Sequence, residues 1–100
     1  MINFALLGTG RIGKLHASII NDHPEASLKY VYDIDTSSAK KIAKKYSCEV
    51  AKTAKEAISS DQINAILIAS ATPTHTDYIA LGAECNKAIL CEKPIDLDIN

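Results

Sequence analysis

The chain alternates short apolar runs with amphipathic stretches from one end to the other, and this alternation limits the folds open to it. The apolar runs are rich in Ile, Val, Leu and Tyr, which favours β-strands, whereas the stretches between them repeat apolar residues at helical spacing. The first and fourth runs are almost continuously apolar, as expected for strands covered by helices on both faces. The predicted strands cover residues 2–8, 28–33, 48–50, 63–70 and 87–92.

The stretches between these runs predict helices that connect parallel strands. From Ala39 to Tyr46, apolar residues recur at three- and four-residue spacing, and lysines occupy the other side. We interpret those lysines as a solvated helix face rather than a phosphate or nucleic-acid patch. Helices are predicted over residues 14–20, 36–46, 53–60 and 72–85. Strands joined in this way by right-handed crossovers predict an α/β, doubly wound parallel sheet of the Rossmann type, in the order 3-2-1-4-5.

Local signals mark the ends of the later helices. Thr53 and Glu56 have the spacing of a capping box, and Pro73 suits the first turn of the last helix, where a missing N–H costs nothing. Asn86 lies where that helix must turn back into the fifth strand, and Asn can adopt the left-handed conformation needed there.

Gly8, Gly10 and Gly13 form a G-x-G-x-x-G motif in the sequence GTGRIG, between the first predicted strand and the first predicted helix. In this position Gly8 would permit a tight turn, Gly10 would let the backbone approach a pyrophosphate, and Gly13 would let the helix lie against the sheet. Backbone amides near Arg11 and Ile12, at the positive end of the helix, would then bind the diphosphate. The alternative is a glycine turn that binds no ligand.

Asp33 follows the last glycine of the motif by 20 residues and ends the second predicted strand. A carboxylate at this place can accept hydrogen bonds from the adenosine ribose hydroxyls and repels a 2′-phosphate. The neighbouring Ile34 offers no cation that would attract the phosphate of NADP, so NAD is the expected cofactor. The alternative is that Asp33 only opens the next turn or caps the next helix, a role for which Asp35 is the better candidate.

The fourth and fifth predicted strands should end at the same edge of the sheet as Gly8, because all three strands are parallel. The 70–72 segment would pass beneath the nicotinamide half of the cofactor, and His75 would lie in the first turn of the following helix. The candidate residues that follow these two strands are Ser70, Ala71, Thr72, His75, Glu92 and Lys93.

Lys93 could accept the hydroxyl proton when an alcohol is oxidised, provided that its surroundings lower its pKa. A partly desolvated cleft and a positive nicotinamide ring would both act in that direction. Alternatively, Lys93 stays charged and only orients hydroxyl groups. Glu92 would hold the lysine or a ribose hydroxyl, and Pro94 would fix the local backbone. On spacing alone, an exposed lysine in a turn has equal weight.

Composition removes several classes of partner. The formal net charge is −1, which predicts neither a nucleic-acid partner nor an anionic membrane surface. No apolar run approaches the roughly 18 residues of a membrane span. The first residues lack the features of a signal peptide, so a cytoplasmic protein is expected. Three cysteines without a C-x-x-C pair indicate reduced thiols and no metal site.

The combination of GTGRIGKLHA, Asp33, ASATPTH and CEKPIDLD resembles the glucose–fructose oxidoreductase/inositol dehydrogenase/MocA family, most closely its inositol dehydrogenases. The resemblance covers the whole chain. It implies NAD-dependent oxidation of a ring hydroxyl of myo-inositol or a similar polyol, with Lys93 as the catalytic lysine and Glu92 in contact with the cofactor. The chain departs from the family at Asn86, where glycine is usual, and in the shortened TPTH sequence.

The resemblance also has implications for domain organisation. Family members are much longer and carry a second α/β domain that binds substrate and forms tetramers. Residues 1–100 are therefore expected to be an N-terminal dinucleotide-binding domain that ends before a sixth strand and lacks the C-terminal substrate domain. The full-length parent is expected to be a homo-oligomer, most simply a tetramer. The alternative function is a stand-alone NAD-binding module, acting as a sensor or binding a partner without catalysis.

Overall fold

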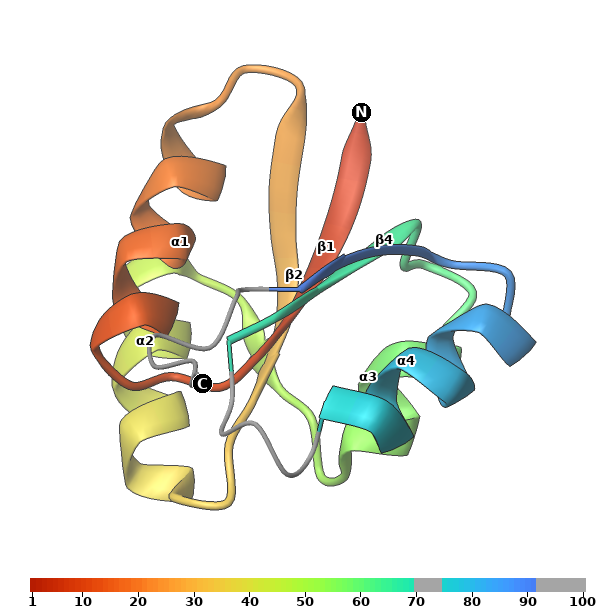
Figure 1. Cartoon of the computed structure of the whole chain (residues 1–100). Coiled ribbons are helices and arrows are strands. Elements are labelled where there is room, and N and C mark those ends of the chain that lie inside the picture. The colour runs from red at the N-terminus through yellow and green to blue at the C-terminus, as the bar shows by residue number, and fades with distance from the viewer. Residues whose placement is uncertain (70–74, 92–100) are drawn as a thin grey trace, which may run out of the picture.

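Strands and helices alternate along the chain in the computed structural model, which describes residues 1–69 and 75–91 (Figure 1). The strands are β1 (Ile2–Leu7), β2 (Ala26–Tyr32), β3 (Glu49–Val50), β4 (Ala65–Ile68) and β5 (Ala88–Cys91). The helices are α1 (Arg11–Asp22), α2 (Thr36–Tyr46), α3 (Ala54–Ser59) and α4 (His75–Glu84). Every predicted strand is present, and the strand ends differ from the prediction by at most two residues.

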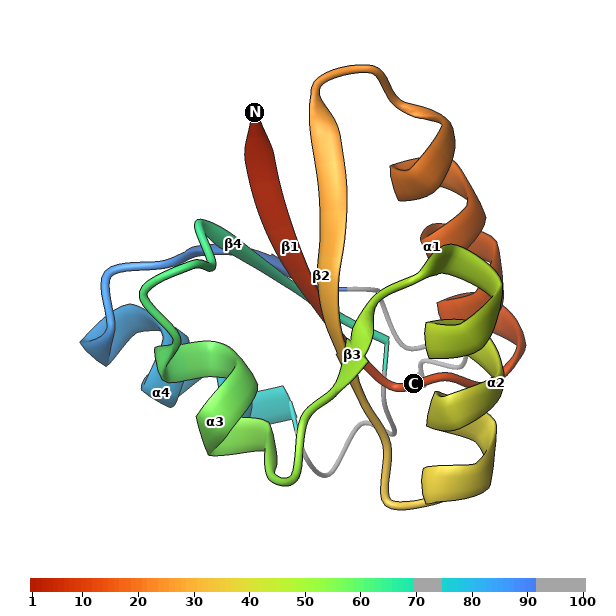
Figure 2. The ribbon, with the colours of Figure 1, turned by 180° about the vertical axis from the view of Figure 1, so that it is seen from behind.

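The strands form one parallel sheet in the order β3-β2-β1-β4-β5, which confirms the predicted doubly wound topology. Helices α1 and α2 cover one face, and α3 and α4 cover the other (Figures 1 and 2). Alternate residues of β1 enter the two cores because successive side chains of a strand point to opposite faces. Leu6 packs with residues of α1 and α2, whereas Ala5 and Leu7 pack with residues of α3.

The register of the sheet brings the carboxyl ends of four strands into line. Leu7 of β1 is paired with Tyr32 of β2 and with Ile68 of β4, and Ile68 is paired with Cys91 of β5. The segments that follow these strands therefore all begin at one edge of the sheet. In open α/β sheets this edge is where ligands bind.

Strand β2 is longer than predicted, and β3 is very short. β2 begins at Ala26 because its first residues pair with the start of β1, and a register shift between Phe4 and Ala5 leaves Lys29 as an extra residue. β3 pairs only with Tyr30 and Val31. The first half of β2 therefore has an open edge on the side of β3.

The helix ends agree with the local signals, with one difference. Thr53 Oγ1 accepts a hydrogen bond from the Glu56 N–H at 3.0 Å, as predicted. In a capping box the Glu56 carboxylate would accept from the Thr53 N–H. It accepts instead from the N–H of the preceding residue, Lys52, at 2.6 Å. Asn86 adopts the predicted left-handed conformation, with φ of 60°. Pro73 lies outside the described residues.

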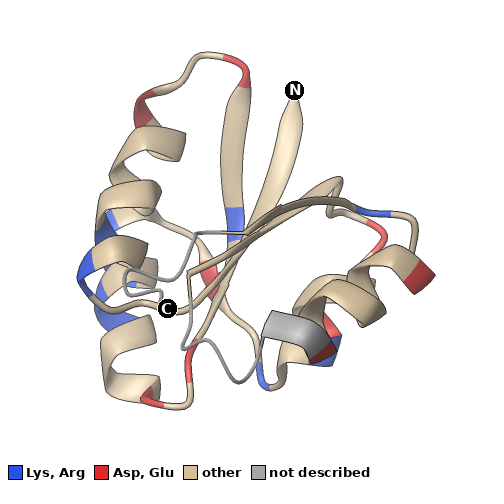
Figure 3. Cartoon of the chain, viewed as in Figure 1, with Lys and Arg blue, Asp and Glu red and all other residues tan. Residues whose placement is uncertain are grey.

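The lysines of α2 are exposed, as predicted for a solvated face, and the basic residues of α1 and α2 lie on one side of the molecule (Figure 3). The exposed lysines of α2 are Lys40, Lys41, Lys44 and Lys45. None of the helices in the described part of the chain has the length and apolar composition needed to cross a bilayer.

Helix α1 lies directly against the turn that leads into it, and this contact requires glycine at position 13. A Cβ atom on Gly13 would lie 2.0 Å from the Gly8 carbonyl oxygen and 2.8 Å from its carbonyl carbon. Gly82 in α4 is also crowded, but its obstacles are the side-chain ends of Ile66, at 2.7 Å, and Ile89, at 3.2 Å. Backbone atoms cannot rotate away as side-chain ends can.

We therefore expect Gly13→Ala to lower the free energy of unfolding by roughly 3 kcal/mol, because the helix must move away from the turn. Gly82→Ala should cost less than about 1 kcal/mol, since the isoleucine ends can shift and alanine favours the helix. Urea denaturation of the two variants measures the difference. Equal losses for both would show that the contact at Gly13 is not the rigid one described here.

Candidate functional site

The glycine turn follows β1 without a break. The Gly8 N–H donates to the Tyr32 carbonyl of β2 at 2.8 Å, and the φ of 107° at Gly8 is one that residues with side chains rarely adopt. The chain can thus leave the sheet sharply and enter α1 at Arg11. The structural roles predicted for Gly8 and Gly13 are confirmed, whereas contact with a pyrophosphate stays a prediction.

The N-terminus of α1 carries no side-chain cap. Gly10 occupies the cap position with φ of −74°, and the first intrahelical bond runs from the Lys14 N–H to the Gly10 carbonyl at 2.8 Å. The amides of Arg11, Ile12 and Gly13 consequently have no acceptor within the helix. Among the described residues, a Cβ on Gly10 would meet no atom within 4 Å, so these donors adjoin space that the described part of the chain leaves open.

The next two helices differ from α1 in this respect. Asp35 caps α2, its Oδ1 accepting from the amides of Ser37 at 3.1 Å and Ser38 at 3.3 Å, and Thr53 caps α3. α1 alone among these three leaves its first amides to another acceptor. Such an end is suited to an anion because the amide groups and the helix dipole act together.

Asp33 lies beside the glycine turn and is held by it. Its Oδ2 accepts from the Thr9 N–H at 2.7 Å and from the Thr9 hydroxyl at 2.8 Å. Its Oδ1 accepts from the Asp35 N–H at 2.9 Å, which also makes Asp33 the opening residue of the turn before α2. Asp33 therefore has the local role that the alternative interpretation gave it, while the capping of α2 belongs to Asp35.

These hydrogen bonds decide in which direction the pKa of Asp33 departs from its ordinary value. Partial burial raises the pKa of the Asp33 carboxyl, but hydrogen bonds from the Thr9 amide and hydroxyl and from the amides of Asp35 and Ile34 outweigh it and lower the pKa below its ordinary value of 3.8. The carboxylate is thus ionised at neutral pH. The pKa of Tyr78, on α4, shifts in the opposite direction. Burial is the main cause that raises it, and repulsion by Tyr32, Asp33 and Asp77 adds to the effect.

Thr9 and Ser38 were not among the residues predicted for the site. Thr9 is completely buried, and its hydroxyl lies 2.9 Å from the Ser38 hydroxyl as well as 2.8 Å from Asp33. A threonine between the first two glycines was the only signal in the sequence. Nothing in the sequence paired it with a serine 29 residues away.

The remaining candidates are only partly within the described residues. Ser70, Ala71, Thr72, Glu92 and Lys93 lie outside them, so their roles stay predictions. α4 begins at His75, as predicted for the first turn of that helix. The flanking residues are in place, because the Ala69 N–H donates to the Leu7 carbonyl at 2.7 Å and Cys91 ends β5 at the same edge.

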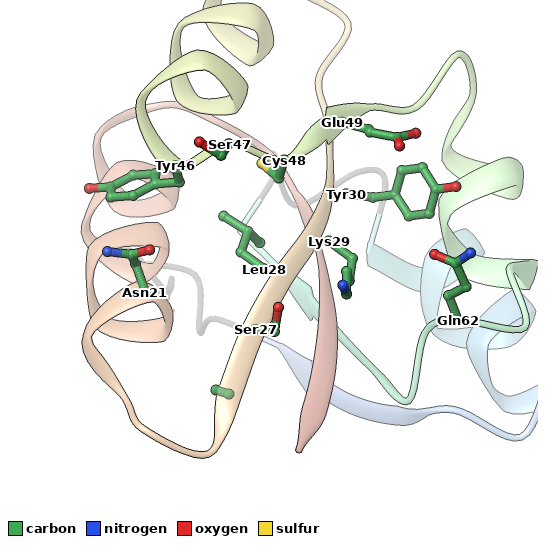
Figure 4. A pocket seen from close by; sticks show the side chains of 11 residues that line it. Asn21, Ser27, Leu28, Lys29, Tyr30, Tyr46, Ser47, Cys48, Glu49 and Gln62 are labelled. Carbon is green, nitrogen blue, oxygen red and sulfur yellow. The ribbon is translucent and has the colours of Figure 1, made fainter.

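A cavity of about 280 Å³ lies elsewhere, beside the open edge of β2 (Figure 4). Ser27, Lys29, Tyr46 and Cys48 are among the residues that line it. None of the predicted cofactor residues within 1–69 and 75–91 is among them. Burial raises the pKa of Cys48 to about 11, so its thiol is not a ready nucleophile. We interpret this hollow as the space left where β3 does not accompany β2.

The family model for the oxidoreductase family with an NAD-binding Rossmann fold matches residues 2–100. The chain belongs to this family. The match confirms the resemblance to the glucose–fructose oxidoreductase/inositol dehydrogenase/MocA family and NAD as its cofactor. It also agrees with the geometry at the carboxyl edge of the sheet, where the glycine turn, the free end of α1 and Asp33 meet.

Individual relatives include dehydrogenases. Inositol 2-dehydrogenase of Rhizobium meliloti (strain 1021) is 44% identical over 97 residues, which are 97% of this chain and 29% of that protein. A crystal structure of a myo-inositol dehydrogenase from Corynebacterium glutamicum ATCC 13032 has a TM-score of 0.89 and 38% identity, covering 98% of this chain and 29% of that one. GenD2 from gentamicin A biosynthesis, crystallised with NAD, has a TM-score of 0.89 and 26% identity, covering 94% and 27%. The chain thus spans less than a third of each.

The lowered pKa of Asp33 predicts an effect of pH on stability. A carboxyl whose pKa is lower in the folded state stabilises that state above its unfolded value of 3.8, and this contribution disappears as the pH falls through the folded value. We expect Asp33→Asn to lower the free energy of unfolding at neutral pH and to flatten its decline in acid. Urea denaturation from neutral pH to about pH 3 measures this.

Asp22→Asn is the control, because Asp22 is exposed at the far end of α1. It should leave the acid decline nearly as in the unmodified chain. If Asp33→Asn and Asp22→Asn give the same pH dependence, the hydrogen bonds to Asp33 do not lower its pKa in solution.

Proposed function

We propose that residues 1–100 bind NAD at the carboxyl edge of the sheet and form the cofactor-binding part of a dehydrogenase that oxidises a ring hydroxyl of myo-inositol or a similar polyol. The observation that carries the proposal is one arrangement: the uncapped end of α1 lies beside a carboxylate that is kept ionised at the end of the next strand. A diphosphate and a ribose require donors and an acceptor placed in this way.

The residues of the edge divide the recognition of NAD among them. The amides of Arg11, Ile12 and Gly13 would donate to the pyrophosphate, with Gly10 leaving room for it. Asp33 would accept from the adenosine ribose hydroxyls and repel a 2′-phosphate. Ile34 is 80% exposed directly after Asp33, so it offers an uncharged surface there and no cation that would favour NADP.

The chemical step would use residues that follow β5. Bound NAD supplies the hydride acceptor for the oxidation of an alcohol. Lys93 would take the hydroxyl proton, or orient the hydroxyl while it stays charged, and Glu92 would hold the lysine or a ribose hydroxyl. Both residues come directly after Cys91, whose register with Ile68 supports their assignment to the crevice side of the sheet. His75 and the 70–72 segment would face the same cofactor.

The choice of substrate rests on the relatives. Two of those described above are named as inositol dehydrogenases, which favours a dehydrogenase over a module that binds NAD without catalysis. The chain matches less than a third of each, so the groups that bind the polyol and complete the catalytic set would lie in the part of the relatives that it does not match. Assembly into a tetramer would depend on that part as well.

Gly10→Ala tests the cofactor site without disturbing the fold. Because a Cβ at position 10 meets nothing within 4 Å, the free energy of unfolding should change by less than about 1 kcal/mol. The added methyl group would occupy space needed by the pyrophosphate, so NAD affinity measured by calorimetry should fall about tenfold or more. Unchanged affinity in a fully folded variant would place the pyrophosphate elsewhere.

A chimera tests the catalytic proposal. We expect the 100-residue chain to bind NAD but to form no NADH with myo-inositol, because hydride transfer needs the alcohol held close to its acceptor. When the chain replaces the matching 97 residues of the Rhizobium meliloti enzyme, myo-inositol oxidation should appear. Lys93→Ala in the chimera should lower kcat by about 100-fold or more while NAD still binds.

Lys55→Ala is the control for this experiment, since Lys55 is exposed on α3. It should leave the rate of the chimera unchanged. Two results would contradict the proposal: myo-inositol oxidation by the 100-residue chain itself, or a Lys93→Ala chimera as active as its parent.

A further inference from the structure

Three side chains from three separate segments meet beside the glycine turn. Thr9 follows β1, Asp33 follows β2, and Ser38 lies in the first turns of α2. Thr9 Oγ1 is 2.8 Å from Asp33 Oδ2 and 2.9 Å from Ser38 Oγ, and Ser38 Oγ is 2.9 Å from the Thr9 carbonyl oxygen. The contacts thus tie the turn, the end of β2 and α2 together.

The number of hydroxyl protons gives this network a direction. Thr9 and Ser38 have one hydroxyl proton each, and an ionised carboxylate can only accept. The Thr9 proton must therefore be donated to Asp33, because no other proton can serve that contact. The Ser38 proton is donated either to the Thr9 carbonyl or to Thr9 Oγ1, both at 2.9 Å. In the first case Ser38 is bonded to the backbone of residue 9, and in the second to its hydroxyl. Both cases tie α2 to residue 9, whose hydroxyl is bonded to Asp33.

Burial makes the arrangement stiff. Thr9 has no exposed surface, so water cannot replace a lost partner of its hydroxyl without opening the turn. A buried hydroxyl with no partner is costly, and hydrogen bonds to a charged group are among the stronger ones in proteins. Rotation of Thr9 away from Asp33 is therefore disfavoured, and it would also break the 2.9 Å contact between the Thr9 and Ser38 hydroxyls.

The network also fixes how the Asp33 carboxylate is used. Oδ2 accepts both bonds from Thr9, while Oδ1 accepts from the Asp35 amide and keeps further accepting capacity. The plane and the charge of the carboxylate are thereby held before any ligand arrives. A carboxylate that could turn away would exclude a 2′-phosphate less strictly than one that is held in place.

We infer that Thr9 and Ser38 are positioning residues that set the preference of this site for NAD over NADP by fixing the Asp33 carboxylate. This inference rests on the proposed function, since it concerns the same cofactor site. Neither residue needs to touch the cofactor. Both act through Asp33, and their removal should change the discrimination between cofactors more than it changes the fold.

The test uses the 100-residue chain with four variants, a fifth variant as reference, and two measurements. Thr9→Val removes the hydroxyl at nearly constant shape, Thr9→Ser restores it, Ser38→Ala removes the second hydroxyl, and Ser37→Ala is the matched control, because Ser37 is exposed one position away. The first measurement is the NMR titration of the Asp33 carboxyl without cofactor. The second is the ratio of the NAD and NADP affinities by calorimetry, with Asp33→Ala as the reference for complete loss.

Thr9→Val should raise the pKa of Asp33 toward its ordinary value. It should also lower the ratio of the NAD affinity to the NADP affinity by about tenfold, as expected for one lost hydrogen bond to a charged group. Ser38→Ala should shift both in the same direction by a smaller amount. Thr9→Ser and Ser37→Ala should leave both nearly unchanged. Ser38 is only half-buried, so this variant remains informative if Thr9→Val does not fold.

The two measurements separate failure of this inference from failure of the proposed function. If the unmodified chain binds neither cofactor, the proposed function is wrong, and the cofactor preference inferred here is wrong with it. If it prefers NAD but Thr9→Val and Ser38→Ala keep the ratio of the unmodified chain, the inference alone is wrong. The same conclusion follows if the Asp33 titration does not move in either variant.

Discussion

The contact of Gly13 with the carbonyl of Gly8 is the constraint on which the rest of the site depends. It brings the first turn of α1 against the end of β1, so the uncapped amides of the helix lie at the carboxyl edge of the sheet. The four aligned strand ends bring the other candidate segments to the same edge. If the helix stood farther from the turn, its amides and the segments after the other strands could not contact the same ligand.

The second constraint is electrostatic. Without hydrogen-bond donors, the partial burial of Asp33 would raise its pKa, because burial alone favours the neutral acid. Donors from Thr9 and Asp35 reverse that effect and hold a carboxylate against Thr9, two residues before the start of α1. The site thus offers donors for a diphosphate and an acceptor for a ribose side by side. Neither feature alone would distinguish a dinucleotide from a simple anion.

The sequence was sufficient for the strand order, the glycine turn and the place of Asp33 at the end of the second strand, because these depend on local pattern and on the parallel topology. It was also sufficient for the left-handed residue at Asn86. The early start of β2 depends on pairing between distant segments, which residue patterns do not encode. The same reason hid Thr9 and Ser38, whose hydroxyls meet only when the turn and α2 are packed together.

The central claim is that the edge formed by the glycine turn and Asp33, rather than the hollow beside β2, receives NAD. Titration of the isotope-labelled chain with NAD, followed by amide chemical shifts in NMR, tests this most directly. The account predicts that the largest changes fall on residues 8–13 and 33–38, with little change at the residues beside the hollow, such as Ser27 and Cys48. Large changes at those two residues, with an unaffected glycine turn, would contradict it.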